Sequence, residues 1–112
     1  MNVVILRGTL SSDPVSRELA SGSVLVSLEL TTTVDEVAVS VPVAWFDPAK
    51  EVAFAAGDAL VVTGTVRRRF FRSAGRTQSR TEVVAIEVVP AGRSRQVNSA
   101  VSRALSRLEA AA

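Results

Sequence analysis

The feature that most constrains the fold is a pair of alternating runs in the first half of the chain. Every second residue is apolar in Val24–Thr32 (VLVSLELTT), and the same alternation runs through Val37–Phe46 (VAVSVPVAWF). Successive side chains of a β-strand point to opposite faces, so this period of two indicates two half-buried strands. The short acidic segment Thr33–Glu36 between them predicts a hairpin. Pro42 cannot donate a ladder hydrogen bond, which indicates an edge or a bulge at that position.

Three further strands and one loop are expected around this hairpin. The loop is Ser11–Gly22, because it is rich in Ser, Asp, Pro and Gly. The strands are apolar runs rich in β-branched residues, and they span Asn2–Leu10, about Ala59–Phe71, and Thr77–Val89.

The segment that follows the third strand predicts a helix. Asp47 can cap it, Pro48 suits its first position, and Pro48–Ala56 would end at Gly57. Three strands, one helix and two strands is the order of the OB-fold, a small Greek-key barrel. The sequence therefore predicts an all-β fold with one short helix, a five-stranded OB barrel over residues 1–90. Another small barrel or a sandwich is the alternative.

The chain changes character after Pro90. Residues 91–112 form a basic C-terminal tail, rich in alanine, leucine and arginine, that is expected to be helical or disordered. An isolated helix of this length is marginal in water, so the tail either docks on another surface or frays. We expect it to be dispensable for folding. Its apolar stripe at helical spacing consists of Val97, Val101, Ala104, Leu105 and Leu108.

Composition excludes several classes of site. The 112 residues include no cysteine and no histidine, so disulfides, thiolate metal sites and histidine-based catalysis are ruled out. No nucleophile and base stand in a recognisable pattern. We therefore expect a protein that is not an enzyme and that uses no cofactor or metal. No apolar run reaches the ~18 residues of a membrane span, and the N-terminus does not resemble a signal peptide. A cytoplasmic protein without a membrane segment is expected.

The charge is distributed unevenly along the chain. Residues 1–66 carry three basic and eight acidic side chains, a net −5, whereas residues 67–112 carry ten arginines and three glutamates, a net +7. A basic half on a nearly neutral chain suggests a polyanionic partner. The alternative is a basic tail that only aids solubility.

The fourth expected strand ends in three arginines and two phenylalanines. Period two puts Arg67, Arg69 and Phe71 on one face, with Arg68 and Phe70 on the other. Cations for phosphates beside a flat ring for a base suit a nucleic-acid strand. The alternative is a solvated strand end with one ring in the core.

Several stretches, in order, resemble the bacterial single-stranded DNA-binding protein family over residues 1–90. These stretches are NVVILRGTLSSDPVSRELASG, VLVSLELTT, VAWFDPAKEVAFAAGDALVVTGTVRRRFF and SAGRTQSRTEVVAIEV. The resemblance implies an OB-fold that forms homo-oligomers, dimers or tetramers, and binds single-stranded DNA without catalysis. It also implies a role in DNA replication, recombination or repair, in the cytoplasm and associated with the nucleoid.

The resemblance also assigns roles to individual residues. Phe46 and Phe71 match stacking aromatics at the ends of the third and fourth strands, and Arg67 and Arg69 match phosphate contacts. Three more arginines surround the last turn and are expected to form a basic finger over the bound strand, unless the hairpin is simply solvated. They are Arg72, Arg76 and Arg80.

Three departures from the family indicate a divergent, short paralogue. Ser40 stands where the family has an aromatic, and the loop Thr33–Glu36 is short and acidic where the family's is often long and basic. The family's acidic C-terminal tail, which recruits partner enzymes, is replaced by a basic one. Recruitment of partners through the tail is therefore not expected. A second hypothesis follows, a protein-interaction or primosome-like OB module with weak or no DNA binding.

Neighbouring aromatics on a strand must face opposite ways. Trp45 continues the stripe of valines, so we predict that it is in the core and that Phe46 faces outward. Phe70 shares a face with Leu60 and Val62 under strict alternation. We therefore predict that Phe70 is inside and Phe71 outside.

Overall fold

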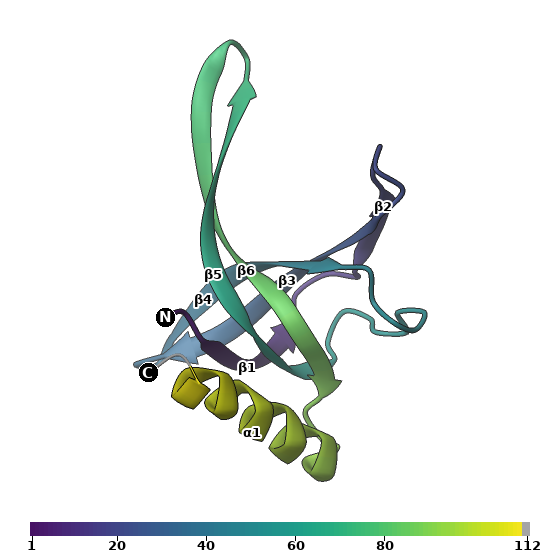
Figure 1. The fold of residues 1–112 in the computed structure, drawn as a ribbon, viewed down its shortest axis with the longest axis vertical. Coiled ribbons are helices and arrows are strands. Elements are labelled where there is room, and N and C mark those ends of the chain that lie inside the picture. Colours follow the sequence, from purple (N-terminus) through teal and green to yellow (C-terminus); the bar gives the residue numbers. More distant parts are fainter. Residues whose placement is uncertain (111–112) are drawn as a thin grey trace.

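The computed structural model describes residues 1–110 and consists of six strands followed by one helix (Figure 1). The predicted fold class is confirmed, since the chain is mainly β and forms a closed five-stranded barrel of OB-like shape with one additional strand. No helix within residues 1–110 is long and apolar enough to cross a membrane. The elements are β1 (Val4–Leu10), β2 (Val15–Glu18), β3 (Val24–Val34), β4 (Val37–Phe46), β5 (Ala59–Ser73), β6 (Arg76–Pro90) and α1 (Ser94–Ala110).

The strands follow the order β1-β5-β6-β4-β3-β2, and a β1–β3 pairing closes the barrel. The predicted hairpin is confirmed, because β3 and β4 pair antiparallel with Val34 opposite Val37. Asp35 and Glu36 at its tip have φ angles of 50° and 65°. Two left-handed residues make a turn whose twist matches that of the flanking strands. The parallel pairing of β4 with β6 is short, with Val43 opposite Val83.

The core lies inside the barrel and is made by the alternating apolar positions. Leu28 and Leu30 from β3 pack there with Leu60 and Val62 from β5, all almost fully buried. Trp45 packs against this cluster, as predicted. Burial of these side chains on one face of each strand explains the period of two in the sequence.

The predicted helix over residues 48–56 is wrong, because the segment is an irregular loop. Val52 and Phe54 both pack against the core, and side chains two residues apart share a side only in extended backbone. Aspartates bind the loop's amides, since Asp58 accepts a hydrogen bond from the Ala55 amide at 2.9 Å. The amide of Ala56 likewise donates to Asp13 at 2.8 Å, so aspartates and not helical carbonyls bind these two amides.

The expectation of a plain loop over residues 11–22 is also wrong, because it contains β2. This strand pairs antiparallel with β3, from Val15 opposite Ser27 to Glu18 opposite Val24. All four residues of β2 are exposed, so no buried stripe marks it in the sequence.

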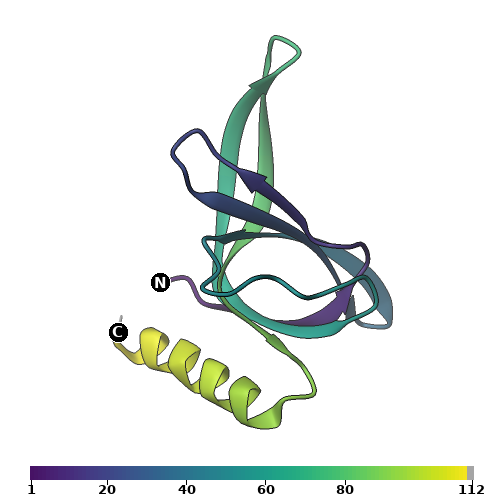
Figure 2. The same ribbon diagram turned by 90° about the vertical axis from the view of Figure 1, so that its right-hand side faces the viewer.

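The tail is helical and lies against the outer surface of the barrel, beside β1, β5 and β6 (Figure 2). Ala100 and Ala104 are 0% exposed. Arg103 donates two hydrogen bonds to Glu87 of β6, from Nε at 3.0 Å and from Nη2 at 2.6 Å. These hydrogen bonds lower the pKa of Glu87 from its ordinary value. The tail thus docks rather than frays. That it is dispensable for folding stays a prediction.

Both β5 and β6 continue beyond the barrel as a long two-stranded ribbon (Figure 1). The pairing shifts register between Thr63 and Gly64, where a bulge bends the ribbon. A Cβ on Gly64 would lie 2.1 Å from the backbone oxygen of Val84. Only glycine allows that approach, and Gly64 is also the last residue of β5 that pairs with β1. Residues 67–82 of the ribbon are called the finger below.

Candidate nucleic-acid interface

The finger has two chemically different faces. Its register puts Arg67 opposite Glu82, Arg69 opposite Arg80, and Phe71 opposite Gln78. Directly opposed residues share a face, so these six side chains lie on one face of the finger, called the groove face below. Arg68, Phe70 and Arg72 lie on the other face. The division of the finger predicted from alternation is therefore confirmed.

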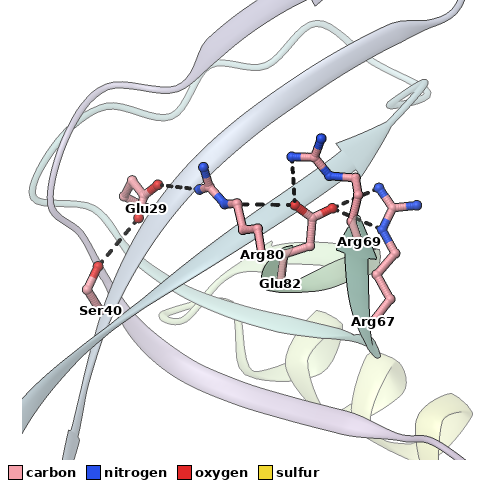
Figure 3. Close-up of polar contacts among 6 residues, drawn as sticks. All are labelled: Glu29, Ser40, Arg67, Arg69, Arg80 and Glu82. Carbon is pink, nitrogen blue, oxygen red and sulfur yellow. Dashed lines mark hydrogen bonds and ion pairs between the residues drawn. The ribbon is translucent and has the colours of Figure 1, made fainter. Parts of the chain in front are cut away.

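Glu82 lies at the barrel end of the groove face and is only 6% exposed. Its Oε2 accepts hydrogen bonds from Nε and Nη2 of Arg67, at 2.9 and 2.7 Å. Its Oε1 lies 3.6 Å from Nη2 of Arg69 and 3.9 Å from Nε of Arg80. One buried carboxylate therefore contacts three arginines, as Figure 3 shows.

A second carboxylate extends this network to β3. Glu29 accepts a hydrogen bond from Nη2 of Arg80 at 3.1 Å, and Ser40 donates one to Glu29 at 3.4 Å (Figure 3). Unlike Glu82, the Glu29 side chain is 41% exposed. Ser40, the position where the resemblance puts a missing aromatic, thus helps hold this carboxylate.

The two aromatics predicted as stacking platforms lie beside the arginines. The guanidinium of Arg67 is 5.3 Å from the ring centroid of Phe46, and that of Arg69 is 5.1 Å from the ring of Phe71. Both distances fit cation–π contacts. Both rings are half-buried. The structure thus brings Phe46, Phe71, Arg67 and Arg69 together, with Arg80 beside them.

A groove of about 570 Å³ lies at the base of the finger, between it and the β2–β3 hairpin. Sequence reasoning missed two contributors, Glu82 and Arg17 of β2, which both line it. Arg17 was missed because β2 has no apolar pattern. Glu82 could have been found by counting pairs outward from a two-residue turn at Ala74 and Gly75. No group of metal-ligand side chains comes together within residues 1–110.

The remaining two predicted arginines are near the finger tip and outside the groove. Arg72 lies on the opposite face and donates a hydrogen bond to the backbone oxygen of Gly75 at 3.0 Å. Arg76 is opposite Ser73, on the same side as the groove face but at the far end. Of the three arginines predicted to form a basic finger, Arg80 therefore lines the groove, whereas Arg72 and Arg76 lie at the tip of the finger.

The prediction that Phe70 is in the core is wrong. Phe70 is 66% exposed and packs under the guanidinium of Arg68, 5.5 Å from its ring centroid. Past the Val66–Val83 pair, where Val83 is still part of the core, the ribbon leaves the barrel, so neither face has a core beneath it at Phe70. Alternation correctly assigned the face but could not show where the barrel ends.

A scan against models of known protein families finds no match for this chain, and a search of curated proteins finds none either. The barrel, the finger and the groove are therefore the basis for inferring a function.

Proposed function

We propose that this protein binds single-stranded DNA along the groove face, without catalysis, in DNA replication, recombination or repair in the cytoplasm. The observation that carries the proposal is the alignment of three arginines and two phenylalanines on one side of the molecule. Arg67, Arg69 and Arg80 surround the groove, and Phe46 and Phe71 lie against two of them. An OB-like barrel with such a face also fits the family resemblance seen in the sequence.

Each group has a defined part in this mechanism. The guanidinium groups neutralise phosphates and release the counterions that surround the strand. The half-buried rings offer flat surfaces to bases, and each stacked base is worth about 1–3 kcal/mol. Only unpaired bases have free faces for stacking, so a single strand is favoured over a duplex.

The direct test is fluorescence anisotropy with labelled oligo-dT, a duplex of equal length and heparin, over a range of salt concentrations. We expect oligo-dT to bind most tightly. The slope of log K against log salt should be about −2 if three arginines each contact a phosphate, at about 0.7 per contact. Binding of oligo-dT no tighter than that of heparin or duplex would contradict the proposal.

A second proposal concerns self-association, and exposed apolar residues favour it. Val34 and Val37, at the tip of the β3–β4 hairpin, are 54% and 62% exposed, and Ile5 of β1 is 41% exposed. Exposed apolar side chains that lie together, as Val34 and Val37 do across the hairpin, commonly mark protein interfaces. We propose a homo-oligomer, and light scattering should give a multiple of the 11.8 kDa chain mass. A monomer at micromolar concentration would contradict it. Association without oligo-dT binding would favour a protein-interaction module instead.

A further inference from the structure

The position of Glu82 is unexpected on a face that would bind a polyanion. A carboxylate there repels phosphates and offsets part of the positive charge. Yet this side chain is the most deeply buried of the charged side chains on the groove face, and it contacts three arginines at once. Its contribution must therefore be something other than attraction of the ligand.

The pairing of β5 with β6 shows which repulsion Glu82 offsets. Arg69 is directly opposite Arg80, and like charges at opposed positions destabilise a strand pair. Arg67 is two residues from Arg69 on the same face, so a third cation joins them. The buried carboxylate lies between the three and is the partner that they share.

Glu82 also fixes the direction of the Arg67 guanidinium. Arg67 contacts Oε2 through both Nε and Nη2, which sets the plane of its guanidinium. A free arginine side chain loses much rotamer freedom when it binds a phosphate. Arginines that are already held in place lose less. Their side chains are still 41–46% exposed and remain accessible from the groove.

We infer that Glu82 is a positioning residue, which holds Arg67, Arg69 and Arg80 as a fixed array for the phosphates of a single strand. This inference rests on the proposed function. It also assigns opposite roles to the two carboxylates that contact Arg80. Glu82 orders the array from beneath, whereas the exposed Glu29 competes with a phosphate for the same guanidinium.

The two carboxylates provide a matched pair of variants. Glu82→Gln and Glu29→Gln each keep the size of the side chain and remove one negative charge from the same surface. If charge alone mattered, both would tighten oligo-dT binding equally. We expect Glu29→Gln to tighten it by up to about fivefold, the effect of one exposed ion pair. We expect Glu82→Gln to weaken it on the order of tenfold, the effect of removing one charged hydrogen bond.

The salt dependence separates positioning from a general structural effect. Glu82→Gln should make the salt slope shallower by about 0.7 for each phosphate that the arginines no longer bind, whereas Glu29→Gln should not. Arg67→Ala should also cost less in the Glu82→Gln background than in the parent protein, because coupled residues are not additive. Circular dichroism and thermal melting establish that the variants are folded.

The outcomes separate this inference from the proposed function. If the parent protein shows no preference for oligo-dT, the proposed function fails. If the parent binds but Glu82→Gln binds as tightly as Glu29→Gln with the same slope, the positioning role is overturned. Should Glu82→Gln not fold, Glu82→Asp serves instead. It keeps the charge but moves the carboxylate away from the arginines by the length of one methylene. Parent-like affinity and slope in Glu82→Asp would equally overturn the inference.

Discussion

The two ends of the β5–β6 ribbon share one pair of strands but have opposite properties. At the barrel end, Leu60, Val62 and Thr63 are fully buried. In the finger, Arg68 and Phe70 are exposed and contact mainly their neighbours on the ribbon. An isolated two-stranded ribbon is marginally stable in water. The barrel end therefore supplies the stability, and the finger can use its side chains for binding.

The largest expected effect is at the barrel end. Leu60→Ala should lower the free energy of unfolding by about 2–5 kcal/mol, because it removes a fully buried side chain and leaves a cavity. Denaturant unfolding measures this loss. At a temperature where the variant is folded, its affinity for oligo-dT should equal that of the parent. A loss of affinity in the folded variant would show that the two ends are not separable.

A smaller effect is expected from the two phenylalanines of the finger, which form a matched pair. Phe71→Ala should weaken oligo-dT binding by about 1–3 kcal/mol with an unchanged salt slope, since stacking releases no counterions. Phe70→Ala on the opposite face should leave binding unchanged. Because Phe70 is mostly exposed, its removal should change stability by no more than about 0.5 kcal/mol. The reverse pattern would place the binding surface on the other face of the finger.

The smallest effect tests whether α1 belongs to the barrel end. The hydrogen bonds from Arg103 lower the pKa of Glu87 in the folded state. The stability from this contact is therefore present above the ordinary pKa of 4.5 and is lost as pH falls through the lower folded-state value. As pH is lowered from 7 to 3, the melting temperature should fall less steeply in Arg103→Gln than in the parent. Equal pH dependence would mean that this contact adds no stability.

Alternation predicted much of this molecule because most strands have one buried face. The β3–β4 hairpin and the two faces of the finger follow from it, and apolar runs rich in β-branched residues predicted β1, β5 and β6. Alternation failed for β2, whose residues are all exposed. Over residues 48–56 the error came instead from the capping signals. There, helix signals at Asp47 and Pro48 were outweighed by the packing of Val52 and Phe54 on the core.

The candidate site was predicted less completely than the fold. Phe46, Phe71, Arg67 and Arg69 were found because they lie in a recognisable local pattern. The role of Glu82 depends on its register with Arg67 across the ribbon, which is visible only when residue pairs are counted outward from the turn at Ala74 and Gly75. The exposure of Phe70 depends on where the ribbon leaves the barrel, which alternation alone cannot locate.

The short parallel pairing of β4 with β6 has a consequence for motion. Two residue pairs, Val43 with Val83 and Ala44 with Val84, join these strands, and the groove lies directly over this seam. Backbone amides in sparsely paired regions open at lower free energy than those of long ladders. The groove therefore lies over one of the two seams of the barrel that are joined by only two residue pairs, the other being the β1–β3 pairing.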